Sequence, residues 1–235
     1  MANKRGNQNL FLALTSAAAA AGAYVLVVRP WMMTWGTSLE ETYSLLPGDE
    51  LLLEPKINAT HAITIHAPAN LVWPWLVQLG QGRGGFYSYD WIENLVHLDI
   101  HTADRILQEH QGLKVGDKIP FAPNDFGVPV VILEPERALV LHADTRNDKS
   151  TDTMKMRPGD YLAVSWGFYL ISHEDGSTRL IERFKTDWKP SLPNDLIYRT
   201  FLEPGSFLME RKMLLTIKQK AEALYLSNLR SEVHP

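Results

Sequence analysis

The chain has 235 residues, 45% of them hydrophobic, which is enough for one well-buried domain, alone or with an appendage. Its formal net charge of −4 is spread along the sequence, and the lack of a lysine- or arginine-rich block argues against nucleic acid as a partner. There is no cysteine, which excludes disulfides, thiolate metal ligands and a cysteine nucleophile while leaving the redox compartment open.

Residues 10–28, LFLALTSAAAAAGAYVLVV, are an uncharged and mostly apolar run. With a rise of 1.5 Å per residue, a helix of this length would extend roughly 28 Å, close to the hydrocarbon thickness of a bilayer. A cleaved signal peptide and a soluble helix are the alternatives to a retained span. Lys4 and Arg5 precede the run, and this charge bias favours a cytoplasmic amino terminus. We therefore expect residues 1–29 to be a single-pass membrane anchor that carries an extracytoplasmic domain.

The domain should begin well after this run. Residues 30–58 contain turn residues and no sustained periodicity, so we expect a linker that packs partly on the domain. The domain itself should occupy residues 59–227, followed by a tail at residues 228–235. It opens with an alternating strand at residues 61–67, and Pro68 then starts a helix at the favoured first-turn position.

The second half of the chain is rich in strands. Two further helices are expected at residues 89–98 and 103–110, beyond which the hydrophobic period changes from about 3.6 to 2. The remaining expected elements are strands at residues 117–122, 128–135, 137–144, 160–174 and 177–188, and a last helix at residues 206–226. Only the last helix is long enough to cover the apolar face of such a sheet. The sequence thus predicts an α+β fold, a curved antiparallel β-sheet wrapped around a long C-terminal helix.

The stretch ITIHAPANLVWPWLVQLG, followed by the strand run and a long terminal helix, resembles the SRPBCC superfamily, which contains START-related lipid-transfer domains and polyketide cyclase-like proteins. The likeness covers about residues 58–226, and its best local marker lies at residues 63–73. The stretch GRGGFYSYDW resembles a membrane-anchored bacterial branch of unknown function. The resemblance implies a helix-grip fold with a cavity for an apolar ligand between sheet and helix. The superfamily has no universal catalytic motif, so no catalytic residue is carried over.

Gly80, Gly82 and Gly85 have the spacing of the G-x-G-x-x-G dinucleotide fingerprint. The fingerprint requires a preceding strand, whereas the segment before these glycines has helical spacing, so dinucleotide binding is disfavoured. The glycines then serve either as a tight connection between helices or as a flexible loop over the cavity. In the second case Arg83 would meet a carboxylate or phosphate head group, and the rings of Phe86, Tyr87, Tyr89 and Trp91 would cover the ligand.

Glu182 is the most informative charged residue of the strands. It shares one face of its strand with Leu180 and Phe184, so we expect this face to be buried. A buried carboxylate needs a partner or a raised pKa. The expected partner is an arginine such as Arg83 or Arg105, and the alternative is a general acid or base in the cavity.

The opposite face of the same strand carries Arg179, Arg183 and Lys185, and we expect it to meet solvent. Trp166 and Phe168 lie on the fully apolar face of the preceding strand. The predicted ligand-binding residues are Arg83, Phe86, Tyr87, Tyr89, Trp91, Trp166, Phe168, Glu182, Phe184 and Phe207.

A histidine- and aspartate-rich segment contains His97, Asp99, His101 and Asp104. Its spacing matches no established metal signature, so capping and turn hydrogen bonds are favoured, and we expect neither a metal nor another cofactor. The favoured function is the binding of a hydrophobic small molecule or lipid by a membrane-tethered domain. The alternative is a cyclase- or dehydrase-like enzyme that uses Glu182, Tyr87, Asp90 or His101 in acid/base catalysis. A third class, a structural protein whose own side chains fill the cavity, also remains open.

Overall fold

The computed structural model describes residues 2–123, 126–147 and 159–233. In chain order its elements are α1 (Ala2–Ala23), η1 (Tyr24–Val28), α2 (Arg29–Met33), α3 (Leu39–Tyr43), η2 (Asp49–Leu51), β1 (Ile57–Ile65), α4 (Ala69–Val77), α5 (Asp90–Leu95), η3 (Gln108–His110), β2 (Lys118–Pro120), β3 (Gly127–Glu134), β4 (Ala138–Asp144), β5 (Leu162–Ser172), β6 (Thr178–Trp188), α6 (Leu192–Ile197), η5 (Tyr198–Leu202) and α7 (Glu203–Val233).

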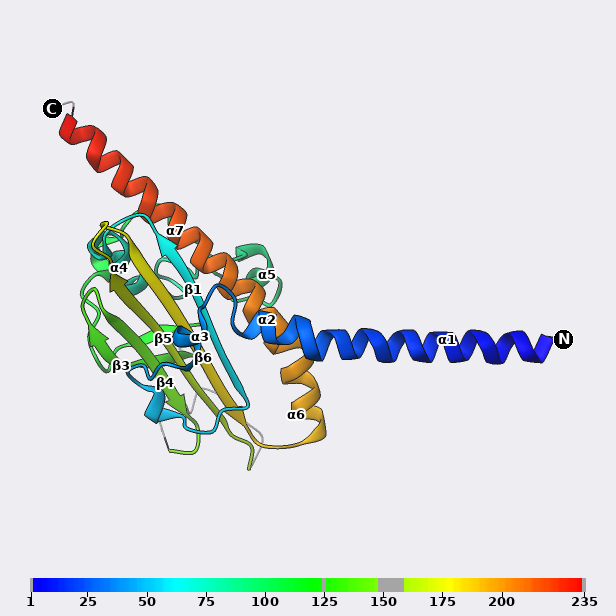
Figure 1. The fold of residues 1–235 in the computed structure, drawn as a ribbon. Helices are drawn as coiled ribbons and strands as arrows, with labels where there is room; N and C mark the ends of the chain where they lie inside the picture. The colour runs from blue at the N-terminus through cyan, green and yellow to red at the C-terminus, as the bar shows by residue number, and fades with distance from the viewer. Residues whose placement is uncertain (1, 124–125, 148–158, 234–235) are drawn as a thin grey trace.

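The strands form one antiparallel sheet in the order β1-β6-β5-β4-β3-β2. β1 and β6 are far apart in sequence, yet they pair along nine residues with His61 opposite Glu182. α7 runs along the sheet and buries one face of it (Figure 1). The α+β class, the antiparallel sheet and the long C-terminal helix are therefore confirmed.

α7 packs on the sheet through a stripe of buried side chains. Phe207, Glu210, Leu214, Ile217 and Ala221 are all buried, and their spacing of three and four residues places them on one side of the helix. Four of the five are apolar, so their burial stabilises the packing of helix on sheet. Glu210 is the exception, a carboxylate inside an otherwise apolar contact.

The outer face of β6 is covered, which contradicts the predicted exposure of its charged residues. Arg183 and Lys185 are buried beneath the segment that contains α3 and η2. Arg183 donates to a carboxylate oxygen of Asp49 at 2.5 Å, and Lys185 donates to the other at 3.2 Å. Arg179 pairs with Glu41 of α3 at 2.6 Å. The face is buried because carboxylates from this segment compensate its charges.

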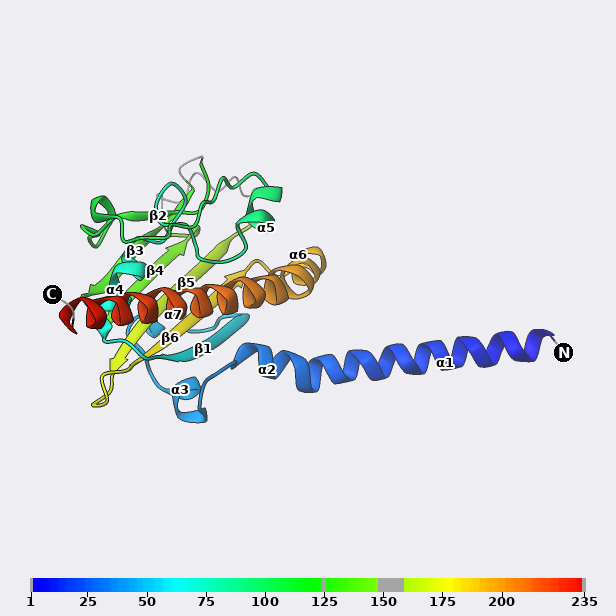
Figure 2. The ribbon, with the colours of Figure 1, turned by 90° about the horizontal axis from the view of Figure 1, so that it is seen from above.

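The predicted membrane anchor is wrong. Within the part of the chain that the structure describes, none of the helices combines the length and the apolar character of a membrane span. α1 has 22 residues, but it begins at Ala2 and so includes the polar segment NKRGNQN. The apolar run continues beyond Ala23 into η1 and is divided between two elements. The expectation considered only residues 10–28, whereas α1 also includes the polar residues before position 10 and ends at Ala23. In Figures 1 and 2, α1 extends away from the sheet.

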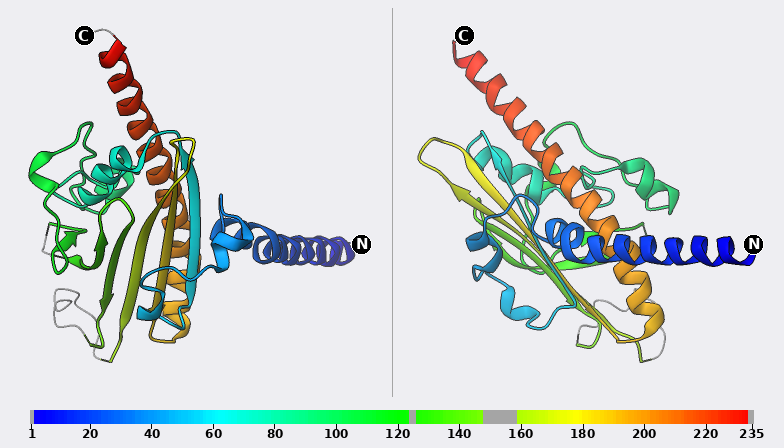
Figure 3. Two further views of the ribbon diagram at one scale, coloured as in Figure 1. Left: turned by 60° about the vertical axis from the view of Figure 1, so that its left-hand side comes forward. Right: turned by 45° about the vertical axis from the view of Figure 1, so that its right-hand side comes forward.

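α2 lies against the domain. Arg29 donates to both carboxylate oxygens of Glu203 at the start of α7, at 2.7 and 2.9 Å. Met32 and Met33 are buried with Ile57 in a small apolar cluster beside β1. The views in Figure 3 show α2 close to β1, where α1 leaves the domain. Residues just after the apolar run thus belong to the packed structure.

The helix expected at residues 103–110 is also wrong, since only the 3-10 turn η3 forms there. The helix expected at residues 89–98 forms as the shorter α5. Positive φ angles at His97 and Asp99 end helical geometry in that region, because a right-handed helix requires negative φ. The five strands after residue 116 all appear near the predicted positions.

Candidate functional site

Three titratable side chains from different elements meet between the sheet and α7. His61 comes from β1, Glu182 from β6 and Glu210 from α7. Their side chains are 0%, 0% and 7% exposed. One ligand atom from each lies within 4.8 Å of the others, and we call this group the buried triad. It is formed by the antiparallel register of β1 with β6 and by the inward side of α7.

The hydrogen bonds of the triad fix the orientation of His61. Nε2 lies 2.8 Å from the carbonyl oxygen of Met32, which can only accept, so Nε2 carries a hydrogen. Nδ1 lies 2.8 Å from Oε2 of Glu182. The other oxygen of Glu182 accepts from the indole Nε1 of Trp166 at 2.6 Å. The predicted burial of Glu182 is confirmed, but its partners are His61 and Trp166, not an arginine.

Glu210 is less well satisfied. Its Oε2 is 3.3 Å from Nδ1 of His61, yet it makes no hydrogen bond with suitable geometry. The reason is that Nδ1 can carry only one hydrogen, which it donates to Glu182 at 2.8 Å. An ionised carboxylate without a hydrogen bond in this environment is costly.

The electrostatics of the triad follow from burial and mutual charge. Burial by itself would lower the pKa of His61, but the charge of Glu182 and the hydrogen bond to it outweigh burial and raise that pKa to about 10. Burial, followed by the charge of Glu182, raises the pKa of Glu210 to about 7. These shifts favour the protonated form of His61 between the two carboxyl groups and disfavour the ionised form of Glu210.

A series of aromatic rings leads from the domain surface to the triad. Phe126 and Phe121 are half-buried, whereas Phe86, Trp166 and Phe168 are buried. Ring centroids are 6.0 Å apart for Phe126 and Phe121, 5.7 Å for Phe121 and Trp166, and 4.9 Å for Trp166 and Phe168. Phe86 lies 5.0 Å from Phe121. We call these five residues the aromatic row; Trp166 joins it to the triad.

The remaining residues of the glycine-rich loop point elsewhere. Arg83 donates to the main-chain carbonyl oxygens of Leu79 and Val77 at 3.0 and 2.7 Å, so its guanidinium secures the end of the α4 segment. Tyr87 is buried, accepts a hydrogen bond from Gln78, and has a pKa that burial raises. None of these three contacts brings the Arg83 or Tyr87 side chain to the triad.

Other predicted ligand-binding residues occupy different surroundings. Trp91 is 66% exposed, and Tyr89 lies beside the ammonium group of Lys212, 5.9 Å from the ring centroid. Phe207 packs edge-on against the ring of His61 with centroids 5.5 Å apart. Phe184 is half-buried between the main core and the Met32 cluster. Of the predicted set, only Phe86, Trp166, Phe168, Glu182 and Phe207 lie in the aromatic row or against the triad.

The glycines form a tight connection, which is one of the two alternatives that the sequence left open. Gly80 and Gly85 exchange two main-chain hydrogen bonds of 3.0 Å, which closes a small hairpin between α4 and α5. Gly85 has a φ of 73°, and a Cβ atom there would lie 2.8 Å from the carbonyl oxygen of His101. A larger side chain is therefore excluded by backbone conformation and by space.

The histidine- and aspartate-rich segment does not form a metal-binding group in the described residues, where the triad is the group with suitable spacing. His101 pairs with Asp99 at 3.0 Å on the exposed surface, and Asp104 accepts from Lys220 at 2.9 Å. The first contact is local, as the expected turn hydrogen bonds would be, whereas the second joins residues 116 positions apart and was not expected.

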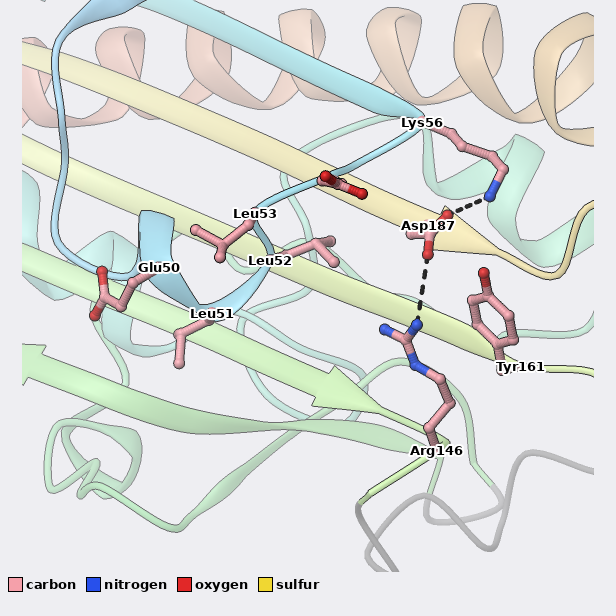
Figure 4. A pocket seen from close by; sticks show the side chains of 9 residues that line it. Glu50, Leu51, Leu52, Leu53, Lys56, Arg146, Tyr161 and Asp187 are labelled. Carbon is pink, nitrogen blue, oxygen red and sulfur yellow. Dashed lines mark hydrogen bonds and ion pairs between the residues drawn. The ribbon is translucent and has the colours of Figure 1, made fainter.

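A pocket of about 530 Å³ lies on the outer side of the sheet, next to the end of β6. Figure 4 shows Lys56 and Arg146 directed toward Asp187 from opposite sides. The guanidinium of Arg146 also lies over the ring of Tyr161, 4.4 Å from the centroid. Because the cations of this pocket are already paired, the triad is the stronger candidate site.

Sequence reasoning missed His61, Glu210 and the carbonyl of Met32. Two of them were marked by periodicity: His61 shares one face of β1 with Ile57, Ala59 and Ile65, and Glu210 continues the spacing of three and four residues along α7. The carbonyl of Met32 gave no signal, because its contact with His61 joins residues 29 positions apart through tertiary packing.

No protein-family model matches the sequence, and the search of curated proteins found no match. Among solved structures, a polyketide cyclase-like protein of Corynebacterium glutamicum is 16% identical, covering 75% of this chain and 93% of its own, with a TM-score of 0.30. A protein of Mesorhizobium loti is 13% identical over 71% and 97% of the two chains, with a TM-score of 0.38. The Aha1 dimer of Colwellia psychrerythraea is 18% identical over 69% and 98%, with a TM-score of 0.35.

The first of these structures is described as polyketide cyclase-like. Nothing among them supports a membrane-anchored branch. Similarity at this level supports no inference about the ligand or the reaction of this chain. The order β1-β6-β5-β4-β3-β2 and the packing of α7 on the sheet are consistent with the helix-grip fold.

Proposed function

We propose that the domain binds an apolar small molecule with an aromatic or fused-ring body, which lies against the aromatic row and turns a hydrogen-bond donor toward the buried triad. The observation that carries this proposal is the position of Trp166. Its ring lies 5.7 Å from Phe121 on one side, and its Nε1 donates to Glu182 at 2.6 Å. One residue thus joins the apolar surface to the polar group.

The row suits such a ligand because it extends from half-buried to fully buried rings. Phe121 and Phe126 are partly accessible, whereas Phe168 has no exposed surface. A planar apolar body gains from burial and from offset contacts with these rings. Glu182 and Glu210 add acceptors at the inner end, which favours an amine or hydroxyl on the ligand over a carboxylate.

The test uses N-phenyl-1-naphthylamine, an uncharged aromatic amine whose fluorescence rises in apolar surroundings. We expect saturable binding to the purified full-length protein, and Phe121→Ala should weaken it about tenfold, which corresponds to roughly 1.4 kcal/mol of lost ring contact. Phe201→Ala is the matched control, since Phe201 is 70% exposed in η5 and outside the row. Native mass spectrometry of protein purified from its host would identify the natural ligand.

Equal affinity of the Phe121 and Phe201 variants for the probe would rule out the aromatic row as the binding surface. Non-saturable fluorescence of the parent protein would contradict the proposal directly. Circular dichroism of each variant establishes that any loss of binding is not a loss of folding.

A second candidate, an acid/base enzyme of the cyclase or dehydrase kind, is favoured by the convergence of three proton-carrying groups at the end of the row. Binding and catalysis are distinguished by turnover: an enzyme converts a polyketide-like substrate, and Glu182→Gln abolishes conversion in protein that circular dichroism shows to be folded. Probe binding without conversion supports the binding function.

A further inference from the structure

We propose that the buried triad is a binding site for one divalent transition-metal ion of the zinc class, held by Nδ1 of His61 and by carboxylate oxygens of Glu182 and Glu210. Nδ1 lies 2.8 Å from Oε2 of Glu182 and 3.3 Å from Oε2 of Glu210, and one central ion can bridge such separations at bond lengths of about 2.0–2.2 Å; all three donor atoms lie within 4.8 Å of one another. The proposed function places the body of the ligand on the aromatic row, whereas this inference rests on the triad; Glu182 and Glu210 belong to both, so a bound ion would lie at the inner end of the ligand.

The hydrogen bonds behind the triad are those that a metal site requires. A histidine ligand usually donates its second ring N–H to a carbonyl or carboxylate, which orients the other nitrogen toward the metal. In this protein Nε2 of His61 has the carbonyl of Met32 at 2.8 Å, so Nδ1 faces the two glutamates. Oε1 of Glu182 is held by Trp166 at 2.6 Å, which leaves Oε2 directed toward His61.

Glu210 gives a second indication that an ion binds to the triad. Its Oε2 is buried, has no hydrogen bond and points toward the centre of the triad. The hydrogen of Nδ1 cannot satisfy both glutamates at once, because it is used at 2.8 Å by Glu182. An ion at the centre would bond to Oε2 of Glu210 and to Nδ1 of His61 at the same time, so each of the three ligand atoms of the triad would have a partner.

Charge and ligand type decide which ion fits. Metal binding displaces the hydrogen of Nδ1 and any proton on Glu210. The two ionised glutamates and the neutral imidazole that result carry a net charge of −2, which a divalent ion neutralises inside the low-dielectric core. Calcium needs six to eight oxygen ligands and magnesium retains several waters, which three side chains in a buried site do not provide. Imidazole with carboxylates suits zinc and its first-row neighbours.

The test uses full-length protein treated with a chelator and desalted, then titrated with Co²⁺ alone, with no organic ligand present. We expect one Co²⁺ per chain with the visible absorption of a four- or five-coordinate ion, and its displacement by Zn²⁺. Trp166→Phe removes the donor behind Glu182 and should weaken binding about tenfold. Glu210→Gln should weaken it further, whereas Glu222→Gln, the matched change on the same helix, should leave it unaltered.

Folded parent protein that takes up no Co²⁺ in this spectral form would overturn the proposal, as would equal affinities in the Glu210 and Glu222 variants. If Glu210→Gln does not fold, X-ray absorption spectroscopy of the zinc-loaded parent protein tests the site by the type and number of ligands around the zinc ion. One nitrogen and at least two oxygen ligands at about 2.0–2.2 Å support the triad. A first shell with several imidazole ligands would contradict it. Since probe binding is measured separately, either proposal can fail without the other.

Discussion

The substitution Glu182→Gln tests how the buried triad contributes to the fold. Glu182 accepts two hydrogen bonds, from the indole of Trp166 at 2.6 Å and from the imidazole of His61 at 2.8 Å. The amide of glutamine has one acceptor oxygen and one donor nitrogen. It can therefore keep only one of these bonds, and its NH₂ group must face the other donor.

The expected cost is about 3 kcal/mol of unfolding free energy. Losing a charge-assisted hydrogen bond removes about 1.5–3 kcal/mol, and leaving a buried donor unpaired costs about 1–3 kcal/mol. The sum is limited because Glu210 lies only 3.3 Å from Nδ1 of His61 and can take over as its counter-charge. Breaking a buried ion pair generally costs 3–5 kcal/mol, about the same range.

The assay is equilibrium unfolding in urea, followed by circular dichroism in the presence of a chelator so that metal binding does not contribute. Glu109→Gln is the matched control, because Glu109 is exposed and its loss should change stability by less than about 0.5 kcal/mol. A double-mutant cycle with His61→Gln should show a coupling of about 2 kcal/mol. If Glu182→Gln is as stable as the control, or if the two changes are additive, the proposed contact between His61 and Glu182 is refuted.

Two further predictions concern the outer face of β6. Asp49→Asn leaves the buried cations Arg183 and Lys185 without their carboxylate and should destabilise the protein by about 3 kcal/mol in urea unfolding, whereas Glu50→Gln, an exposed neighbour, should have little effect. Equal stability of the two variants would contradict the burial of this face. Arg179 donates a hydrogen bond to Glu41, and this bond outweighs burial and lowers the pKa of Glu41 below 4.5. Its stabilisation is therefore present above that pH and is lost as the pH falls through the folded value. The difference in stability between parent and Glu41→Gln should then shrink in acid, and a difference independent of pH would argue against the pair.

The candidate site could be predicted only in part. Alternation along β6 placed Glu182 on the inward face, and this held because the two sides of a strand are fixed by its local geometry. The expectation that an arginine pairs with Glu182 was wrong, because the side chains that contact this carboxylate are His61 and Trp166. His61 lies 121 positions away in the sequence, and only the pairing of β1 with β6 brings it opposite Glu182.

The expected exposure of Arg183 was wrong for a related reason, on the opposite face of β6. Its alternation with inward residues was read correctly, but nothing in the strand indicates that residues 39–51 lie over its outer face. Turn residues in that segment suggested a linker, whereas Asp49 and Glu41 form ion pairs with the charged residues of β6. Local periodicity identifies opposite faces, and it does not say what each face meets.

The sequence by itself determined the strands, the long C-terminal helix and the inward face of β6, because these depend on hydrophobic period and turn chemistry within short windows. The tertiary structure decided which polar groups meet. Strand register and the rotation of α7 join His61, Glu182 and Glu210, and α2 closes the group through one carbonyl. Such contacts depend on relative positions across the whole fold, to which a single segment of sequence contributes only one partner.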